Sequence, residues 1–281
     1  MKKFFLKVTR ENLPQVKDKY PFIYLEHGRL EIDDSSVKWI DADCNVVPLP
    51  VATINTILLG PGTTVTHAAI AALASANCTV CWTGSESLIF YAAGFEPTSD
   101  SRNLRKQISL AFGRNSRAEV VREMFKARFP EVDLSEMTIQ EMMGIEGSRV
   151  RDLYKEKAEK YHISWEGRDY TPGHFMEGTV TNKILTHCNT ALYGILCSVI
   201  HSLGFSPRIG FVHSGSPLPF VYDIADLYKS EVSIDLAFSL TASLFGEYDS
   251  AAVAEAFIDR IIKQKIISRA VTDIKKLMKV N

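Results

Sequence analysis

The feature that most constrains the fold is a change in hydrophobic periodicity close to residue 97. Residues 20–96 hold short runs of β-branched and aromatic residues separated by Gly, Pro, Asn and Asp, which is typical of strands joined by turns. From residue 99 onward, apolar residues recur every three or four positions, which indicates amphipathic helices. We therefore predict an α+β protein of two domains, a β-rich domain of residues 1–96 and an α-helical domain of residues 97–281.

The N-terminal domain is expected to be a small β-sandwich-like unit with one helix. Two extended runs flank a turn at His27, and the Ala-rich run THAAIAALASAN predicts a helix that Thr66 caps and Asn77 ends. Cys78 and Cys81 form a CxxC pair, but the chain has no second pair of similar spacing. This pattern favours buried core thiols over a metal or redox site.

The bulk composition of the chain excludes few classes of function. The 281 residues carry a formal net charge of −1, so overall charge does not indicate a nucleic-acid-binding protein. Five cysteines, an odd number, favour reduced thiols and a cytoplasmic location. The N-terminal apolar run is interrupted at Lys7, so we expect no signal peptide. The apolar stretch 190–205 is shorter than the roughly 20 residues of a membrane span, and we expect it to be a buried core helix.

Positive charge is concentrated locally between Arg102 and Arg128. This segment holds eight Lys and Arg residues against two acids, Glu119 and Glu123. A basic helical hairpin of this kind is a candidate phosphate-facing surface. A solvated helix face has equal weight, because charge runs commonly serve solubility.

Residues 211–229, FVHSGSPLPFVYDIADLYK, hold one histidine and two aspartates in a mostly apolar setting. Asp223 and Asp226 are spaced three apart, which on a helix places both carboxylates on one face. Buried acids require partners such as cations or metals. His213 lies upstream of them, and on this evidence alone it is more often a core histidine than a ligand.

A further acid, Glu146, lies between Gly144 and Gly147 in a stretch that predicts a helix from near residue 139. Glycine destabilises a helix by about 0.8–1 kcal/mol relative to alanine, so the pair suggests that another group approaches the backbone closely. Arg149 and Arg151 follow and could bind phosphate. The alternative is an exposed Glu146 that pairs with Arg149.

Glu, His and Asp side chains together form a hard oxygen and nitrogen ligand set. Without thiolates, such a set suits Mg²⁺ or Mn²⁺ better than structural zinc. Nothing in the spacing brings Glu146 close to His213. The residues by themselves therefore support only a hypothesis of metal-dependent phosphodiester chemistry.

Three separated segments resemble one known family. They are GPGTTVTHAAIAALA (60–74), GIEGSRVR (144–151) and GFVHSGSPLPFVYDIADLYK (210–229). In this order they resemble the CRISPR-associated spacer integrases, the Cas-one family, and the similarity is greatest to the subtype I-E branch. The resemblance covers nearly the whole chain and implies an N-terminal β-domain joined to a helical catalytic domain.

The resemblance also implies a catalytic site and a reaction. Glu146, His213 and Asp226 would be ligands of Mg²⁺ or Mn²⁺, with Asp223 as an essential catalytic neighbour. The family joins the 3′-hydroxyl ends of captured DNA to the CRISPR array by transesterification and also acts as a DNA endonuclease. Lys229 would neutralise phosphate.

Partners follow from the same resemblance. Tyr170 and Tyr193 would lie near the substrate strand, where aromatic rings can stack on unpaired bases. The expected DNA substrates are a duplex with single-stranded 3′ ends and the CRISPR array. The protein would form homodimers, two of which flank a dimer of the small Cas-two protein.

Two positions depart from the family pattern: His27 replaces an aromatic wedge, and Ser216 replaces a lysine of some relatives.

Two other functions remain open at this point. The same ligands could serve a nonspecific metal-dependent nuclease of branched DNA, in which water is the nucleophile. A non-catalytic DNA-binding scaffold subunit would use the acids only to pair with arginines.

Overall fold

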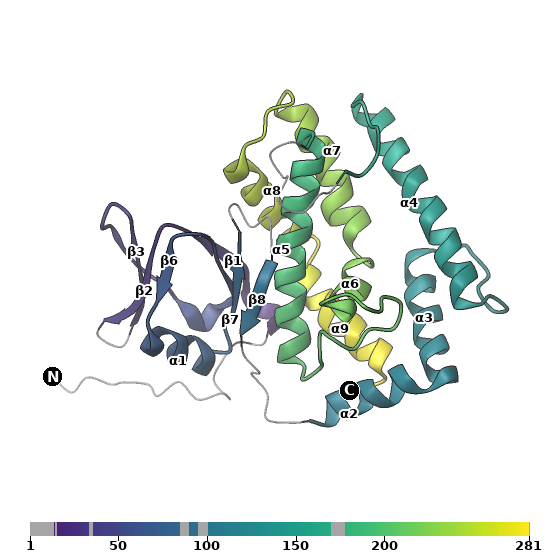
Figure 1. The fold of residues 1–281 in the computed structure, drawn as a ribbon, viewed down its shortest axis with the longest axis horizontal. Helices are drawn as coiled ribbons and strands as arrows, with labels where there is room; N and C mark the ends of the chain where they lie inside the picture. Colours follow the sequence, from purple (N-terminus) through teal and green to yellow (C-terminus); the bar gives the residue numbers. More distant parts are fainter. Residues whose placement is uncertain are drawn as a thin grey trace. The chain divides into compact units, whose positions relative to one another are not determined.

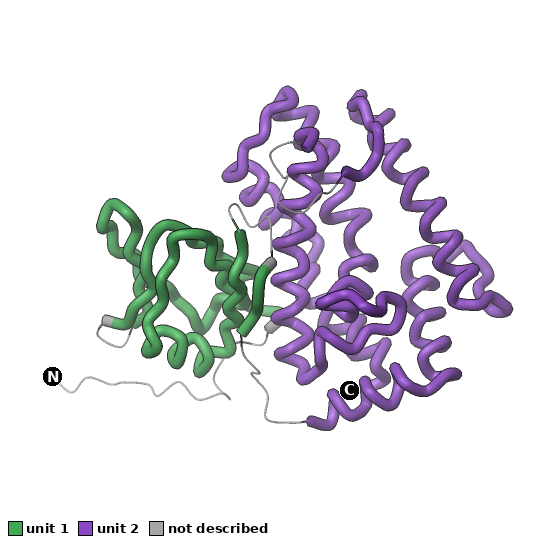
Figure 2. The backbone as a smooth tube through the Cα atoms, in the orientation of Figure 1, with its two compact units in different colours: residues 1–97 green, residues 98–281 purple. Residues whose placement is uncertain are grey.

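A computed structural model of the chain describes residue 14 and residues 16–33, 36–84, 90–94, 101–169 and 178–280. The chain divides into two compact units, residues 1–97 (unit 1) and residues 98–281 (unit 2), which Figure 2 colours green and purple. Each unit has its own buried core, and each is described separately below.

The described residues of unit 1 form two four-stranded sheets (Figure 1). The first sheet has the order β1-β5-β7-β8, formed by Tyr20–Leu25, Ile54–Leu59, Thr79–Thr83 and Phe90–Gly94. The second has the order β4-β3-β2-β6, formed by Val46–Pro48, Ser36–Asp41, Gly28–Asp33 and Thr63–Val65. Short 3-10 turns, Val16–Asp18 and Val51–Thr53, precede β1 and β5. The predicted β-rich character of this region is confirmed.

The strands on either side of His27 do not pair with each other. β1 pairs in parallel with β5, whereas β2 pairs antiparallel with β3 in the other sheet. His27 has a φ of 54°, so the chain changes direction there and passes from one sheet to the other. The turn predicted at this position therefore joins two sheets.

One helix, α1 (His67–Ser75), completes the core of unit 1. Thr66 caps it by accepting a hydrogen bond from the backbone N–H of Ala69, and Asn77 follows with a φ of 50°, as the sequence predicted. Apolar side chains of both sheets and of α1 belong to one cluster, which also holds Cys78. Cys78 and Cys81 are both buried free thiols, so the prediction of core thiols is confirmed.

All the regular secondary structure in the described residues of unit 2 is helical (Figure 1). The α-helices α2 to α9 are Arg102–Phe112, Arg114–Arg128, Ile139–Tyr161, Val180–Ser202, Pro219–Ala225, Asp235–Ser243, Ser250–Lys263 and Ile266–Met278. A single π-helical turn, η6 (Ser230–Ile234), lies between α6 and α7. The mixed α and β composition agrees with the prediction.

Helix α5 is the core of unit 2. It packs against α6, α7, α8 and α9, and 17 of its 23 residues are buried. By length and composition it could span a membrane, but 83% of its most apolar window is buried inside the protein. The expectation of a buried core helix in this region is confirmed, and the helix begins ten residues earlier than the apolar stretch 190–205.

Helices α3 and α4 form one side of the candidate site. The buried face of α3 comprises Val120, Val121, Met124 and Phe125, the residues that the periodicity indicated. Helix α4 begins at a capping box in which Thr138 and Glu141 satisfy each other's backbone N–H groups. Phe112, at the end of α2, is 80% exposed, so the apolar recurrence noted from residue 99 onward does not give a buried face along the whole of this helix.

Candidate active site

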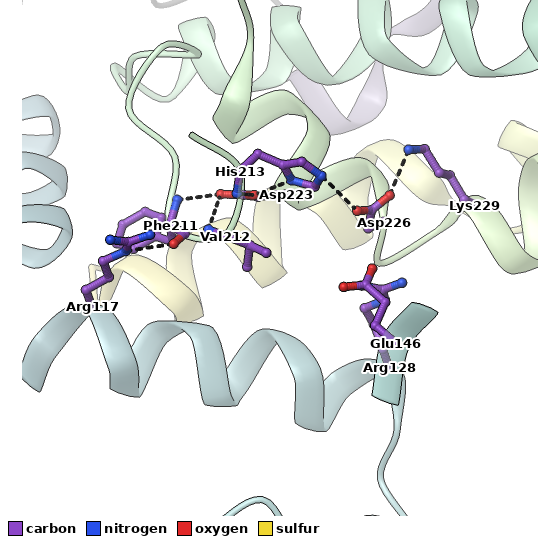
Figure 3. A network of polar contacts seen from close by, with 9 residues as sticks. All are labelled: Arg117, Arg128, Glu146, Phe211, Val212, His213, Asp223, Asp226 and Lys229. Atoms are coloured by element: carbon purple, nitrogen blue, oxygen red, sulfur yellow. Dashed lines mark hydrogen bonds and ion pairs between the residues drawn. The ribbon is translucent and has the colours of Figure 1, made fainter. Parts of the chain in front are cut away.

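The carboxylate of Asp223 organises the loop that carries His213. It accepts backbone hydrogen bonds from Phe211 (2.5 Å), Val212 (3.2 Å) and His213 (2.9 Å), and a further one from His213 Nδ1 at 2.8 Å (Figure 3). Its side chain is fully buried. A buried carboxylate without these donors would be strongly destabilising, so the loop and Asp223 depend on each other.

Asp223 also sets the orientation of the His213 ring. A carboxylate only accepts hydrogen bonds, so Nδ1 carries the proton and Nε2 faces the other way, 3.8 Å from Asp226 Oδ2. The hydrogen bond to Asp223 raises the pKa of His213. A histidine whose first ring nitrogen is held by a carboxylate has the arrangement found around metal-ligating histidines.

Asp226 lies one residue beyond the end of α6, on the opposite side of the His213 ring from Asp223 (Figure 3). Its Oδ1 forms an ion pair with Lys229 Nζ at 2.7 Å, and the Lys229 ammonium lies 5.1 Å from the centre of the Tyr193 ring. Burial by itself would lower the pKa of Lys229, but the interactions with Asp226 and Tyr193 together outweigh it and the pKa is raised. The two aspartates thus have different surroundings despite their helical spacing.

Glu146 lies in the first half of α4, and its carboxylate forms an ion pair with Arg128, the last residue of α3. Both side chains are mostly buried. The alternative pairing of Glu146 with Arg149 is wrong, because Arg149 pairs with Glu131. The space beside Gly144 is open, with no atom within 4 Å of the place that a methyl group on this residue would occupy, which leaves room for a ligand to approach the helix there.

Glu146 and Asp226 line the same cavity, which has a volume of about 1280 Å³. Its other charged and tyrosine lining comprises five basic residues, three further acids and two tyrosines, namely Arg128, Arg149, Arg168, Lys229, Arg269, Asp152, Glu156, Glu231, Tyr154 and Tyr193. His213 and Asp223 are not part of the lining and lie behind Asp226. A wall that combines carboxylates with several cations is suited to a polyanion held beside a metal.

The predicted metal ligands are not clustered in this structure. Over the described ranges of the chain, no three His, Cys, Asp or Glu side chains form a group that could hold a metal ion. His213 approaches Asp226, whereas Glu146 is turned to Arg128 (Figure 3). The oxygen and nitrogen donors of Glu146, His213 and Asp226 are of the chemical type that a hard divalent ion prefers. Glu146 and Asp226 line one cavity, in which such an ion could reach both carboxylates.

The predicted DNA contacts differ in their surroundings. Tyr193 is half-buried in α5, packs edge-on against Tyr222 and lines the cavity, so it is accessible from the site. Arg149 lies over the Phe129 ring at 5.1 Å and also lines the cavity. Arg151 is exposed and lies outside the lining. Tyr170 lies outside the described residues.

Several site residues were missed by the sequence interpretation. Arg117 donates from Nε to the Phe211 carbonyl at 2.8 Å, and Gln107 Nε2 donates to the Ser206 and Ile209 carbonyls. Both side chains therefore hold the segment that leads to His213. The basic run 102–128 was the available signal for Arg117, and the buried polar Gln107 had none.

Arg168 is a further cation that the sequence did not single out. Its guanidinium donates to Asn182 Oδ1 and Thr186 Oγ1, both at 2.7 Å, which fixes it at the cavity wall. Arg168 thereby places a guanidinium, a donor suited to anions, at the cavity wall.

Comparison with known proteins identifies relatives along most of the chain. The sequence model of one family, described as "CRISPR associated protein Cas1", matches residues 130–245. The chain is 56% identical to "CRISPR-associated endonuclease Cas1 2" of Chlorobaculum tepidum, over 98% of this chain and 93% of that protein. It is 36% identical to "CRISPR-associated endonuclease Cas1" of Escherichia coli, over 83% of this chain and 77% of that protein.

A solved structure shares the fold. The structure described as "Crystal structure of TtCas1-DNA complex" superposes with a TM-score of 0.69 at 34% sequence identity. The match covers 95% of this chain and 99% of that chain. Both units described above therefore have counterparts in a protein solved with DNA.

Proposed function

Because this chain belongs to the Cas1 family of CRISPR-associated endonucleases, we propose that it integrates captured DNA into CRISPR arrays by metal-dependent transesterification. The observation that carries the proposal is the shared cavity. Glu146 and Asp226 line it, and His213, held by Asp223, directs its free nitrogen toward Asp226. Hard acidic and imidazole donors beside a basic wall suit phosphodiester chemistry.

Glu146, His213 and Asp226 would hold Mg²⁺ or Mn²⁺. When bound, such an ion supplies Lewis-acid stabilisation of the negative charge that develops on the phosphate. Asp223 would not be a ligand, because its two oxygens already accept four hydrogen bonds from the loop 211–213. Its role is to fix the imidazole of His213 in the orientation that leaves Nε2 free.

The proposed reaction exchanges one phosphodiester for another. The 3′-hydroxyl oxygen of the captured DNA bonds to a phosphorus atom of the array, and the bond from that phosphorus to its own 3′-oxygen breaks. The proton of the attacking hydroxyl ends on the departing oxygen, so no net proton or nucleotide cofactor is consumed. Lys229 stands beside Asp226, where its ammonium would neutralise charge on the phosphate.

The cationic wall would hold the DNA backbone. Arg149, Arg168 and Lys229 line the cavity from α4, the segment after α4 and the segment after α6. Tyr193 offers an aromatic face on which an unpaired base could stack without sequence preference. Arg151 and Tyr170 remain proposed contacts further along the strand. The relative solved as a DNA complex supports DNA as the ligand.

The assembly belongs to the same proposal. We expect a cytoplasmic protein of the subtype I-E branch that forms homodimers, two of which bind a dimer of the small Cas-two protein. The substrates would be a duplex with single-stranded 3′ ends and the CRISPR array.

A strand-joining assay tests the function. Purified protein and its Cas-two partner are incubated with Mn²⁺, a supercoiled array plasmid and a labelled duplex with free 3′-hydroxyl ends. We expect covalent joining by the wild-type protein and none by Asp226→Ala, because one proposed ligand is lost. The exposed Asp259→Ala on α8 is the matched control and should join normally. Joining by Asp226→Ala at the wild-type rate would refute the assigned site.

The same assay separates the alternatives. The names of the relatives specify endonucleases, which favours cleavage as a second activity of the same residues. A nuclease that uses water would cut the duplex without the partner and without a free 3′-hydroxyl. A non-catalytic scaffold would bind the DNA and give neither product, with or without EDTA.

A further inference from the structure

The ion pair between Arg128 and Glu146 blocks a carboxylate that the proposed function assigns to the metal. The side chains of the two residues are only 14% and 18% exposed, and both line the cavity. Because Arg128 Nη1 holds Glu146 Oε1, a divalent ion must either displace the guanidinium or share the carboxylate with it by binding the other oxygen. Sharing would bring two positive centres together in a partly desolvated site, which is unfavourable.

The other proposed metal ligand that lines this cavity, Asp226, is neutralised in the same way. Asp226 pairs with Lys229 at 2.7 Å, so each of the two acids that line the site and are proposed as ligands already holds one basic side chain. This pairing explains how both acids remain stable in one cavity before a metal is present, since unpaired partly buried carboxylates would be destabilising.

Arg128 has a second set of contacts that does not involve Glu146. Its guanidinium lies 5.1 Å from the centre of the Phe129 ring and 5.8 Å from that of Phe125. Stacking of this kind supports a guanidinium at a cavity wall whether or not its carboxylate partner is present. Displacement from Glu146 would therefore leave the group facing the cavity and free to bind an anion.

On this basis we propose that Arg128 is an internal competitor of the divalent ion at Glu146. Metal binding transfers Glu146 from the guanidinium to the ion, and the released Arg128 then binds a phosphate of the DNA in the same cavity. The inference rests on the metal site of the proposed function. It adds a coupling by which metal and DNA strengthen each other's binding.

The first test is metal affinity without DNA. Mn²⁺ binding to the full chain is measured by electron paramagnetic resonance for the wild type and for Arg128→Gln. The variant should bind Mn²⁺ about tenfold more tightly, which corresponds to about 1.4 kcal/mol, because the ion no longer competes with a guanidinium. Arg128→Met, which retains packing against the two rings, should show the same gain, so the result does not depend on the folding of one variant.

Arg149→Gln is the matched control for charge. It removes one positive charge from the same cavity and from the same Phe129 ring, but its ion pair is with Glu131. Its Mn²⁺ affinity should change by less than about threefold, since only the long-range charge effect remains. An equal gain in both variants, or no gain in the two Arg128 variants, would overturn the inference.

Glu146→Gln distinguishes this inference from the proposed function. If the wild type binds Mn²⁺ and Glu146→Gln does not, the metal site stands, and the Arg128 variants alone decide whether competition occurs. If Mn²⁺ binding by the wild type is absent or unaffected by Glu146→Gln, both the metal site and the competition are refuted.

The second test measures DNA affinity by fluorescence anisotropy, with and without Mn²⁺, on a duplex with single-stranded 3′ ends. Mn²⁺ should strengthen DNA binding by the wild type, because it frees Arg128. Arg128→Gln should lose most of this metal-dependent gain, whereas Arg149→Gln should bind more weakly under both conditions and keep the gain. Retention of the full gain by Arg128→Gln would rule out the release of Arg128 to phosphate.

Discussion

At the scale of single residues, the site depends on a division of roles between two aspartates three positions apart. Asp223 faces inward and binds the backbone of the loop 211–213, whereas Asp226 faces the cavity and pairs with Lys229. The positioning of His213 therefore depends on a residue that does not line the cavity. Loss of Asp223 should act on metal affinity through the orientation of the imidazole.

We expect Asp223→Asn to weaken Mn²⁺ binding by about 10–100-fold, the usual effect of removing a residue that orients a metal ligand. The amide retains one oxygen but replaces an acceptor with a donor, so it cannot accept all four hydrogen bonds. Isothermal titration calorimetry measures the affinity. The exposed Asp259→Asn is the control, and an unchanged affinity in Asp223→Asn would contradict the positioning role.

At the scale of elements, the segment between α5 and α6 is held by contacts too close to permit substitution. A methyl group at Gly210 would lie 2.7 Å from Pro219 Cβ, 2.8 Å from the His213 carbonyl and 3.0 Å from Asp223 Oδ2. These distances are well below ordinary van der Waals contact. The segment can place His213 beside Asp223 only if residue 210 has no side chain.

Gly210→Ala should therefore destabilise the protein by about 1–3 kcal/mol, the range for overpacking of a close-packed site. Gly144→Ala is the matched control, because a methyl group there meets no atom within 4 Å and α4 would gain helix propensity. That variant should be more stable by about 0.5–1 kcal/mol. Urea denaturation measures both, and equal effects would contradict the packing argument.

Helix α5 carries a buried titratable group, His187, which is 4% exposed and contacts the Tyr248 hydroxyl at 3.0 Å. Burial lowers the pKa of His187 from 6.5 to about 4. Between these values the unfolded chain binds a proton that the folded chain does not. The free energy of unfolding should therefore fall as the pH drops from 6.5 toward 4, by up to about 1.4 kcal/mol per pH unit.

This pH dependence is measured by comparing His187→Gln with the wild type in urea denaturation at pH 7.5, 6.5, 5.5 and 4.5. Glutamine does not titrate and retains a hydrogen-bonding group toward Tyr248. The stability difference between the two proteins should shift in favour of the variant as the pH falls. Parallel curves would show that His187 is not the group responsible.

At the scale of the whole molecule, local patterns predicted the elements better than their long-range arrangement. The recurrence of apolar residues every three or four positions predicted a helix from near residue 139, and α4 begins there. This start is a local feature, because the capping box that defines it joins two residues only three positions apart, Thr138 and Glu141. The change of periodicity separated strands from helices correctly. The pairing of β1 with β5 was not predictable, since it joins segments about thirty residues apart and depends on packing of the whole unit.

The candidate site shows the same contrast. Helical spacing placed Asp223 and Asp226 in one short segment, but could not show that they face different partners. The pairing of Glu146 with Arg128 joins two helices, so no local spacing reports it. Only the family resemblance connected Glu146 with His213, and the cavity is lined by Glu146 and Asp226 but not by His213.

The most direct test of the central claim is the position of a bound metal. Crystals of the full chain loaded with Mn²⁺ are examined by anomalous diffraction at the manganese edge. We expect one strong peak per protomer, within about 2.3 Å of side-chain atoms of Glu146, His213 and Asp226, with Arg128 displaced from Glu146. A peak elsewhere, or no peak while the Arg128–Glu146 ion pair remains, would contradict the assigned metal site.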